Sequence, residues 1–390
     1  MRYRGLAVGE MAYHTQRRPV MNRLFVGMDV HKEKIVVVGL PEEGNHPLMC
    51  EEFGGHTLSR VVKRLQRLAK TYRIAACYEA GPCGYGLARA LLQAGMECRV
   101  AAPSLIPRRP GDRIKTDGRD ARELALALRA NTLSFVRIPT TEEEQVRGLI
   151  RCREDIAKEV RRIKQVIAHW LLLHGHRVPP GIKSWTPAHR RWMRELELSS
   201  LDRTVLDHYL DVAHLLGERL QLIEDQVVAL ADTEGFRNRV ARLQAFKGFS
   251  KLSAMRVIAE VMEFARFPKA TSFMKFTGLV PSEHSSSNRI RRGRITKAGN
   301  SHLRHVLVEA VQRAKSAARP GRSLSQRLAA VCGPSRQVAL SALTRLHHTF
   351  WRLTRRGVSA GKVKVALARE LAGFVWAMMT LPETPDAAAA

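Results

Sequence analysis

Two carboxylates three residues apart are the first candidates for chemistry in this sequence. Asp117 and Asp120 lie in the segment KTDGRDARELAL, where an alanine- and leucine-rich stretch predicts the start of a helix. On a helix, this spacing directs both side chains to the same side. Aspartates in a first helical turn also cap the helix and complement its dipole. The pair alone therefore leaves both a catalytic and a capping interpretation open.

Two more acidic residues stand in apolar strand patterns earlier in the chain. The β-rich run LFVGMDV contains Asp29, and the run IAACYE ends on Glu79. Four carboxylates at one place repel one another unless cations compensate them, and oxygen-only clusters select Mg²⁺ or Mn²⁺. Two such ions about 4 Å apart can align a water or a hydroxyl for in-line attack on a phosphodiester. For each residue alone, the alternative is a surface or capping carboxylate.

The segments that carry these residues predict a mixed α/β domain over residues 22 to 140. Three strand patterns, LFVGMDV, KIVVVGL and PLMCEEF, come first, followed by a helical pattern at residues 57 to 72. Strands IAACYE and ECRVAAP then alternate with helices GPCGYGLARALLQAG and DGRDARELALALRAN. This order predicts a mixed sheet with right-handed crossovers, as in the ribonuclease H-like fold. It would put Asp29 on the central strand and Glu79 at the end of the fourth.

The charge of the chain points to a polyanionic partner. Of 390 residues, 65 are Lys or Arg and 36 are Asp or Glu, which leaves a formal net charge of +29. Such a balance is typical of a protein that binds nucleic acid. An anionic membrane surface is the alternative, but no apolar run approaches the length of a spanning helix. We therefore expect DNA or RNA as the partner and no membrane insertion.

The cysteines indicate a protein of a reducing cytosol, and both ends of the chain lack a folding pattern. The six cysteines have no CxxC or Cys/His metal-ligand spacing and read as buried or incidental thiols in a reducing cytosol. Residues 1 to 21 lack the apolar core of a signal peptide. We expect residues 1 to 21 to be a disordered extension and residues 383 to 390 to be a disordered tail.

From Thr141 the pattern changes to long helices, which define a predicted coiled-coil and dimerisation region at residues 141 to 235. Apolar residues recur there at the three- and four-residue steps of a heptad seam. Two such helices can close on each other as an antiparallel hairpin or on partner chains. The predicted seams comprise Leu149, Ile156, Val160, Ile163, Ile167 and Trp170, then Leu206, Leu210, Ala213, Leu216, Leu220, Ile223, Val227 and Leu230.

Between the two seams lies a Pro- and Gly-rich loop with aromatic and basic residues. Its side chains could stack on bases or hold phosphates, or they could form ordinary hydrophobic packing with a basic rim. The residues concerned are Trp185, His189, Arg190, Arg191, Trp192 and Arg194.

The remaining segments, residues 236 to 320 and 321 to 382, predict a mainly helical C-terminal part. It opens with LQAFKGFSKLSAMRVIAEVMEF, in which a Gly-bearing turn joins two helical patterns. This is the shape of a helix-hairpin-helix element, whose backbone amides can hold a phosphate. A tight structural turn is the alternative.

A serine triplet, Ser285, Ser286 and Ser287, lies in the segment FTGLVPSEHSSSNRIRRGRITKAGNSHLRHVLVEA. Serine triplets usually form loops. A serine nucleophile would need cations to neutralise the charge that develops on phosphorus, and nearby guanidinium groups are suited to this task. His284 adjoins the triplet, but no His-Asp partner marks a protease-like triad. The candidate nucleic-acid contacts that follow are Arg289, Arg291, Arg292, Arg294, Lys297, Asn300 and Arg304.

Taken together, these segments resemble the DEDD transposases of insertion sequences, the "IS one-ten" group that includes Piv-like DNA invertases. The resemblance runs from Leu24 to Met379. GMDVHKEKIVVVGL, YEAGPCGYGLARALLQAG and KTDGRDARELALAL resemble the RuvC-like segments of that family, whose four metal-binding carboxylates match Asp29, Glu79, Asp117 and Asp120. The segment around the serines resembles the C-terminal transposase domain of the family.

The resemblance also implies a nucleophile. In the family pattern the nucleophilic serine commonly precedes a glycine, and Ser287 stands in the glycine position. This implies that Ser286 is the nucleophile and leaves Ser285 and Ser287 as alternatives.

The activity that the resemblance implies is a cut-and-rejoin recombination of DNA. Serine attacks a phosphodiester and stays linked to it, and the freed hydroxyl of another strand resolves the phosphoserine. Metal at the carboxylates prepares the site, and different protomers supply the two domains. A structured guide RNA from the end of the element directs some relatives. The alternative functions are a RuvC-like structure-selective nuclease that uses water, with the C-terminal half as a DNA-binding module, and a non-catalytic nucleic-acid-binding protein.

Overall fold

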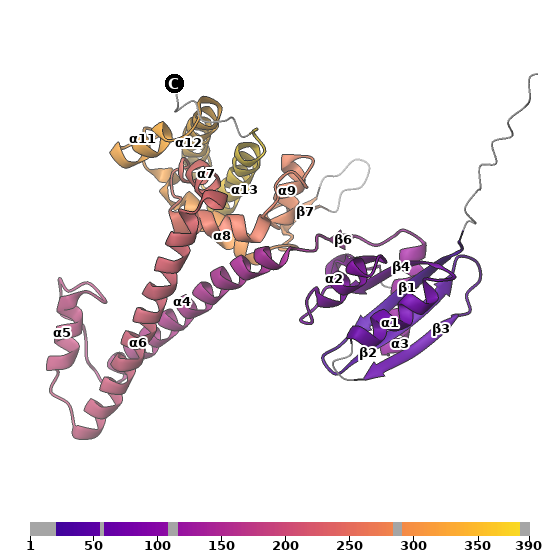
Figure 1. Cartoon of the computed structure of the whole chain (residues 1–390). Helices are drawn as coiled ribbons and strands as arrows, with labels where there is room; N and C mark the ends of the chain where they lie inside the picture. Colours follow the sequence, from indigo (N-terminus) through magenta and orange to yellow (C-terminus); the bar gives the residue numbers. More distant parts are fainter. Residues whose placement is uncertain (1–20, 55–57, 108–115, 284–290, 383–390) are drawn as a thin grey trace, which may run out of the picture. The chain divides into compact units, whose positions relative to one another are not determined.

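The computed structural model describes residues 21–54, 58–107, 116–283 and 291–382. The chain divides into two compact units, Met1–Thr140 and Thr141–Ala390 (Figure 1). The predicted disordered ends lie outside the described residues, except for Met21. Among the described residues, no helix is both long and apolar enough to cross a lipid bilayer.

The first unit is built on a six-stranded mixed sheet with the order β3-β2-β1-β4-β5-β6. Strand β1 pairs antiparallel with β2 and parallel with β4, so it lies inside the sheet. The predicted mixed α/β architecture is therefore confirmed. The two-residue strand β6 was not predicted, because so short a segment carries no periodic pattern. The strands are β1 Arg23–Val30, β2 Lys34–Pro41, β3 Met49–Gly54, β4 Arg73–Glu79, β5 Glu97–Ala101 and β6 Phe135–Val136.

Helices cover both faces of this sheet. Helices α1 (Leu58–Leu68) and α2 (Gly86–Gln93) pack on the face that carries Leu24, Val26 and Met28 of β1. Helix α3 (Asp117–Arg129) packs on the other face, where Phe25 clusters with Leu124 and Leu128. The strict alternation along β1 follows from the two-residue period of a strand. The short 3₁₀ helix η1 (Pro103–Leu105) follows β5.

Gly27 lets α3 approach the centre of the sheet closely. A Cβ atom added to Gly27 would lie 2.0 Å from the carbonyl oxygen of Ala121 and 2.5 Å from the backbone nitrogen of Ala125. No side chain fits into this space, since backbone atoms cannot rotate away as a flexible side chain can. The glycine in LFVGMDV therefore fixes how closely α3 and β1 pack.

The second unit begins with two long helices that lie side by side (Figure 1). They are α4 (Thr141–Leu173) and α6 (Ser200–Ala231), and the short α5 (Pro187–Glu195) stands between them in the sequence. None of the residues predicted for the α6 seam is exposed. Along α4, Ile150 and Glu154 are buried within the seven-residue step that the predicted seam left between Leu149 and Ile156.

The rest of the second unit is mostly helical, as predicted, and encloses one apolar core. Helix α13 lies at its centre and buries Leu367, Leu371 and Val375. The elements are α7 (Glu234–Gln244), α8 (Lys251–Val261), α9 (Ala270–Phe276), β7 (Pro281–Glu283), β8 (Arg292–Ile295), α10 (Ser301–Ala310), η2 (Val311–Lys315), α11 (Arg322–Ala329), α12 (Gly333–Arg355) and α13 (Ala360–Met379).

The close contact at Gly27 generates a prediction. Gly27→Ala should lower the free energy of unfolding by about 1–3 kcal/mol, because the added methyl group overpacks the contact between β1 and α3. Urea denaturation followed by circular dichroism measures this change. Gly39→Ala is the matched control, since a Cβ atom there meets side-chain atoms no closer than 3.4 Å. Equal stability of the two variants would contradict the packing argument.

Candidate functional site

Asp29 and Glu79 occupy equivalent positions on neighbouring strands. The parallel pairing of β1 and β4 sets Met28 opposite Tyr78, and the two acidic residues are the next on each strand. Adjacent strands lie about 4.8 Å apart. Phe25 on β1 and Cys77 on β4 belong to the cluster beneath α3, so strand alternation directs Asp29 and Glu79 to that same face.

Helix α3 brings its first turn to this end of β1. The helix runs antiparallel to the strand, since Gly27 meets Ala121 and Phe25 clusters with residues further along α3. The first turn of α3 contains Asp117 and Asp120. In agreement with this, ligand atoms of Asp29, His31 and Asp117 all lie within 4.8 Å of one another.

His31 in the turn after β1 and Lys34 at the start of β2 lie against these carboxylates. His31 Nε2 lies 3.0 Å from Asp29 Oδ2 and 3.9 Å from Asp117 Oδ1. Lys34 Nζ lies 2.8 Å from Asp117 Oδ2 and 3.3 Å from Glu52 Oε2. The hydrogen bond from Lys34 lowers the pKa of Asp117, and that same bond raises the pKa of Lys34. Asp117 is therefore held ionised.

Sequence reasoning missed His31 and Lys34. Both belong to the segment HKEK, whose polar residues indicated only a hairpin turn. The available signal was their position directly after the strand that carries Asp29. Of the four predicted carboxylates, Asp29 and Asp117 lie close together around His31. Strand register places Glu79 on the strand beside Asp29, and Asp120 follows Asp117 within the first turn of α3. The metal-binding role of the four stays a prediction.

The serine triplet and Arg289 lie outside the described residues, in the segment between β7 and β8. After this segment, Arg291, Arg294 and Lys297 are exposed, while only the backbone of Arg292 is described.

Asn300 and Arg304 make contacts within the fold. The Asn300 Oδ1 atom accepts a hydrogen bond of 2.8 Å from the backbone nitrogen of Leu303 and caps α10. Arg304 Nη1 donates to the carbonyl oxygens of Thr277 at 3.0 Å and Lys297 at 3.3 Å. These two side chains therefore position the start of α10.

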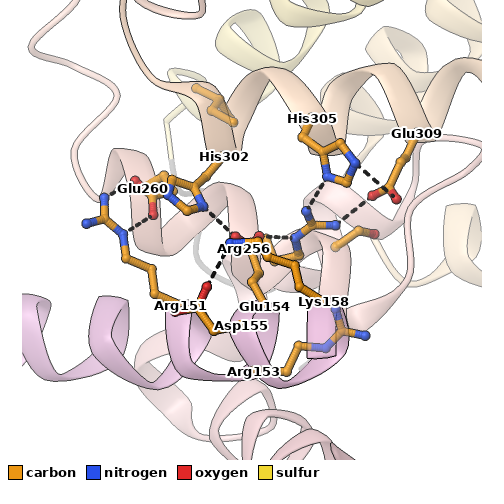
Figure 2. A network of polar contacts seen from close by, with 12 residues as sticks. Arg151, Arg153, Glu154, Asp155, Lys158, Arg256, Glu260, His302, His305 and Glu309 are labelled. Carbon is orange, nitrogen blue, oxygen red and sulfur yellow. Dashed lines mark hydrogen bonds and ion pairs between the residues drawn. The ribbon is translucent and has the colours of Figure 1, made fainter. Parts of the chain in front are cut away.

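A polar network joins α4 to α8 and α10 (Figure 2). Arg256 on α8 is its centre. The guanidinium donates from Nε to Glu154 Oε1 at 2.6 Å and from Nη1 to Glu309 Oε2 at 2.7 Å. Arg256 Nη2 lies 3.0 Å from His305 Nδ1, and His302 Nδ1 contacts the second oxygen of Glu154. The buried carboxylate of Glu154 is thus paired on both sides.

Glu260 forms the second centre of this network. Arg151 donates to both of its carboxylate oxygens, at 2.9 and 3.0 Å, and Asn300 Nδ2 lies 2.5 Å from Oε2. Burial on its own raises the pKa of Glu260, but the hydrogen bonds from Arg151 and Asn300 outweigh it, and the pKa lies below its usual range. The network therefore ties α4 to α8 and α10.

In α5 and the loop before it, the aromatic residues pack inward and the arginines are exposed. His189 is buried, and Trp185 and Trp192 pack against the cluster between α4 and α6. The exposed Arg190, Arg191 and Arg194 line a groove of about 640 Å³ that Lys164 of α4 also borders. The loop thus combines hydrophobic packing with a basic rim, which leaves the arginines available to an anion.

Comparison with known proteins places both units among transposases. Residues 26–175 match a family model of DEDD transposases of IS110, described as "Transposase". Residues 240–327 match one described as "Transposase IS116/IS110/IS902 family".

Individual relatives agree with the family matches. The chain is 37% identical to the transposase y4qE of Sinorhizobium fredii, over 91% of this chain and 88% of the relative. It is 33% identical to the transposase for insertion sequence element IS1533 of Leptospira borgpetersenii, over 62% of this chain and 70% of the relative. It is also 24% identical to the transposase for IS1111A of Coxiella burnetii, over 95% and 94% of the two chains.

The buried Glu260 predicts how stability depends on pH. Because its pKa is lowered in the folded chain, its contribution to stability is present above the ordinary glutamate pKa of about 4.3 and is lost as the pH falls through the lowered value. Glu260→Gln should flatten the acid limb of a plot of unfolding free energy against pH. The exposed control Glu195→Gln should keep the wild-type curve. If Glu260→Gln lost as much unfolding free energy at low pH as the wild type, protonation of Glu260 would not be the cause of that loss.

Proposed function

Since the chain belongs to the IS116/IS110/IS902 family of transposases, and is therefore an enzyme that cuts and rejoins DNA, we propose that it moves an insertion sequence by serine-initiated transesterification. Ser286 is the proposed nucleophile, and Ser285 and Ser287 are the alternatives. A RuvC-like carboxylate centre in the first unit is the proposed second component of the reaction. The observation that carries the proposal is the meeting of Asp29 and Asp117 at the end of β1.

The residues at the end of β1 fit a divalent cation. Carboxylate oxygens of Asp29 and Asp117, and a ring nitrogen of His31, lie close enough to share one ion. Glu79 and Asp120 complete the proposed set of four carboxylates, and oxygen ligands favour Mg²⁺, with Mn²⁺ as an alternative. When bound, Mg²⁺ supplies positive charge that polarises a phosphodiester and offsets the charge of the leaving oxygen.

The chemistry of the serine is a balanced exchange of phosphoester bonds. The Ser286 Oγ atom loses its proton and bonds to phosphorus, and the bond from phosphorus to one strand oxygen breaks. The released strand takes up a proton as a free hydroxyl group. In the second step, a hydroxyl of another strand attacks the phosphoserine and regenerates Ser286. Cationic side chains that follow the serine, including Arg291, Arg294 and Lys297, are suited to stabilise the charge on phosphorus.

A water-dependent RuvC-like nuclease is the second candidate function. It is favoured by one observation, namely that the carboxylate centre lies within the described residues, whereas the serine triplet lies outside them. In this alternative the second unit would only bind DNA.

The proposed partners are DNA and a structured guide RNA encoded by the element, within the bacterial cytoplasm. The net charge of +29 and the basic groove beside α5 support the binding of phosphate backbones. The salt dependence of the affinity for either polymer should be steep, since each neutralised phosphate releases counterions.

We also propose a homo-oligomer built through α6. Away from its seam with α4, this helix exposes a second apolar stripe with successive steps of four, seven, three and seven residues, formed by Leu201, Val205, Val212, Leu215 and Leu222. Leu201 is 80% exposed, Leu215 53% and Leu222 54%. A heptad stripe of this length is typical of helix pairing between chains. Its position on the helix that already packs with α4 favours a second copy as the partner.

The metal proposal predicts the effect of removing one carboxylate. Asp29→Asn should lower strand cleavage more than about 100-fold, since even outer contacts of metal ligands cost roughly 10- to 100-fold. Addition of Mg²⁺ or Mn²⁺ should raise the melting temperature of the wild type but not that of the variant. Glu33→Gln, in the same turn, is the control and should behave as the wild type. Metal stabilisation that persists in Asp29→Asn would exclude this site.

The serine proposal predicts a covalent intermediate. Denaturing gels of a reaction stopped before resolution should contain a protein-DNA adduct, which disappears in Ser286→Ala and persists in Ser285→Ala and Ser287→Ala. Loss of the adduct in one of the other two variants would move the nucleophile to that position. Free 5′-phosphate ends without an adduct in any protein would favour the hydrolytic nuclease.

The proposed oligomer predicts the effect of charges on α6. The double variant Leu215→Glu, Leu222→Glu should reduce the mass in solution, measured by light scattering, from that of the oligomer to that of a monomer. Circular dichroism should remain that of the wild type, because both side chains are exposed. Leu172→Glu, at an exposed leucine of α4, is the matched control. An unchanged mass in the double variant would exclude this stripe as the interface.

A further inference from the structure

A basic pocket lies between the turn that joins α7 to α8 and the start of α11. Its volume is about 900 Å³. The turn contributes the residues KGFS, positions 247 to 250, and the opposite wall comes from η2, the loop after it and the first turn of α11. We call it the turn pocket. All of its lining residues fall within the segment 240–327 that matches the transposase family.

The charge of the turn pocket is almost entirely positive. Its single acidic residue, Glu309, is already paired with Arg256 and His305. Within the described part of the chain, no carboxylate forms an ion pair with the pocket's exposed arginines. The basic residues that line it are Lys247, Arg313, Arg319, Arg322 and Arg327.

Among the described residues, the hydrogen-bond partners of Lys247 and Arg327, which both line the pocket, are carbonyl oxygens. Lys247 Nζ lies 3.0 Å from the oxygen of Ala317, and Arg327 Nη1 donates to the oxygen of Phe249 at 2.7 Å. Burial, aided by the nearby charge of Arg313, lowers the pKa of Lys247, and burial lowers the pKa of Arg327. Several cationic groups thus line one pocket, and none of them forms an ion pair with a carboxylate of the described residues, an arrangement that an anion would stabilise.

The backbone around the pocket adds to this positive character. Helix α11 starts at Arg322 after Gly321, and no side chain caps it. Gly321 and Ser323 line the pocket, so the partial positive charge of a helix start contributes to its wall. Gly248 has a φ of +100°, and a Cβ atom there would lie 2.2 Å from the carbonyl oxygen of Ala310. Glycine therefore holds the turn tightly against α10.

The residues that line the turn pocket indicate which class of ligand it binds. Pockets for small organic ligands are mostly apolar and measure about 300–1,000 Å³. The turn pocket reaches the upper part of this range, but its walls carry guanidinium groups, which match the oxygens of phosphate groups. Sequence specificity requires contacts to base edges, whereas arginine contacts to phosphates position the backbone.

We propose that the turn pocket binds consecutive backbone phosphates of a nucleic acid, independently of its base sequence. The inference rests on the proposed function only in that the chain handles nucleic acid, and it does not depend on the metal centre or on the serine. The proposal extends the helix-hairpin-helix interpretation of the KGFS turn. The turn supplies one wall of the phosphate site, and side chains from η2 to α11 supply the rest.

The test measures binding in EDTA, so that no catalysis takes part. Fluorescence anisotropy with labelled duplex DNA, and separately with duplex RNA, gives the affinity of the full chain between 50 and 200 mM salt. In the double variant Arg319→Ala, Arg322→Ala, the slope of log affinity against log salt should become shallower by about 0.9 for each lost phosphate contact on DNA. The polymer whose slope changes more is the preferred occupant.

Matched variants exclude a general loss of charge or of folding. Arg355→Ala, Arg356→Ala removes the same charge from the exposed end of α12 and should keep the wild-type slope. Arg319→Lys, Arg322→Lys keeps the charge and should retain most of the slope. A double alanine variant with the wild-type slope on both polymers would overturn the proposal for this pocket, with nucleic-acid binding by the chain intact. A wild type with no salt-dependent binding would overturn it together with the proposed function.

Discussion

The contact between β1 and α3 at Gly27 is the constraint on which the candidate site depends. Carboxylates from a strand and from a helix 88 residues later in the sequence meet only if the two backbones come closer than ordinary side chains allow. The missing side chain at Gly27 provides this proximity, and the antiparallel course of α3 then places Asp117 beside Asp29. The positive charge of Lys34 beside Asp117 reduces the repulsion between the carboxylates, and the ring of His31 lies within reach of both.

In the second unit, the long and partly exposed helix α4 is attached to a compact helical core. Helix α4 shares an apolar seam with α6 along much of its length. Near its start it is joined to α8 and α10 by ion pairs that are buried or half-buried. Buried ion pairs add little net stability, but breaking one leaves an uncompensated charge. The ion pairs therefore favour the one arrangement of α4, α8 and α10 in which each buried charge keeps its partner.

Much of the first unit could be predicted from the sequence, because its strands carry clear apolar runs and its carboxylates stand at their ends. The position of Asp117 at the start of a helix followed from a local pattern, and that of Asp29 on an inner strand followed from the order of the predicted strands and helices. His31 and Lys34 were missed because their significance comes from contacts with Asp117, which lies far from them in the sequence. Glu154 was missed for a related reason, since a single charged residue within an apolar stripe reads as exposed unless its partner, Arg256, is known.

The buried Glu154 has a consequence for the way α4 can sit in the fold. Aliphatic heptad stripes are nearly periodic, so a helix that carried only such residues could slide by one repeat, about 10 Å along its axis, and find similar packing. A slide of α4 would withdraw Glu154 from Arg256 and Arg151 from Glu260 at the same time, so that the two buried carboxylates would each lose an arginine partner. The carboxylate of Glu154 thus fixes the register of α4. Of the several alignments that the apolar stripe alone would allow, only one keeps this carboxylate paired with Arg256.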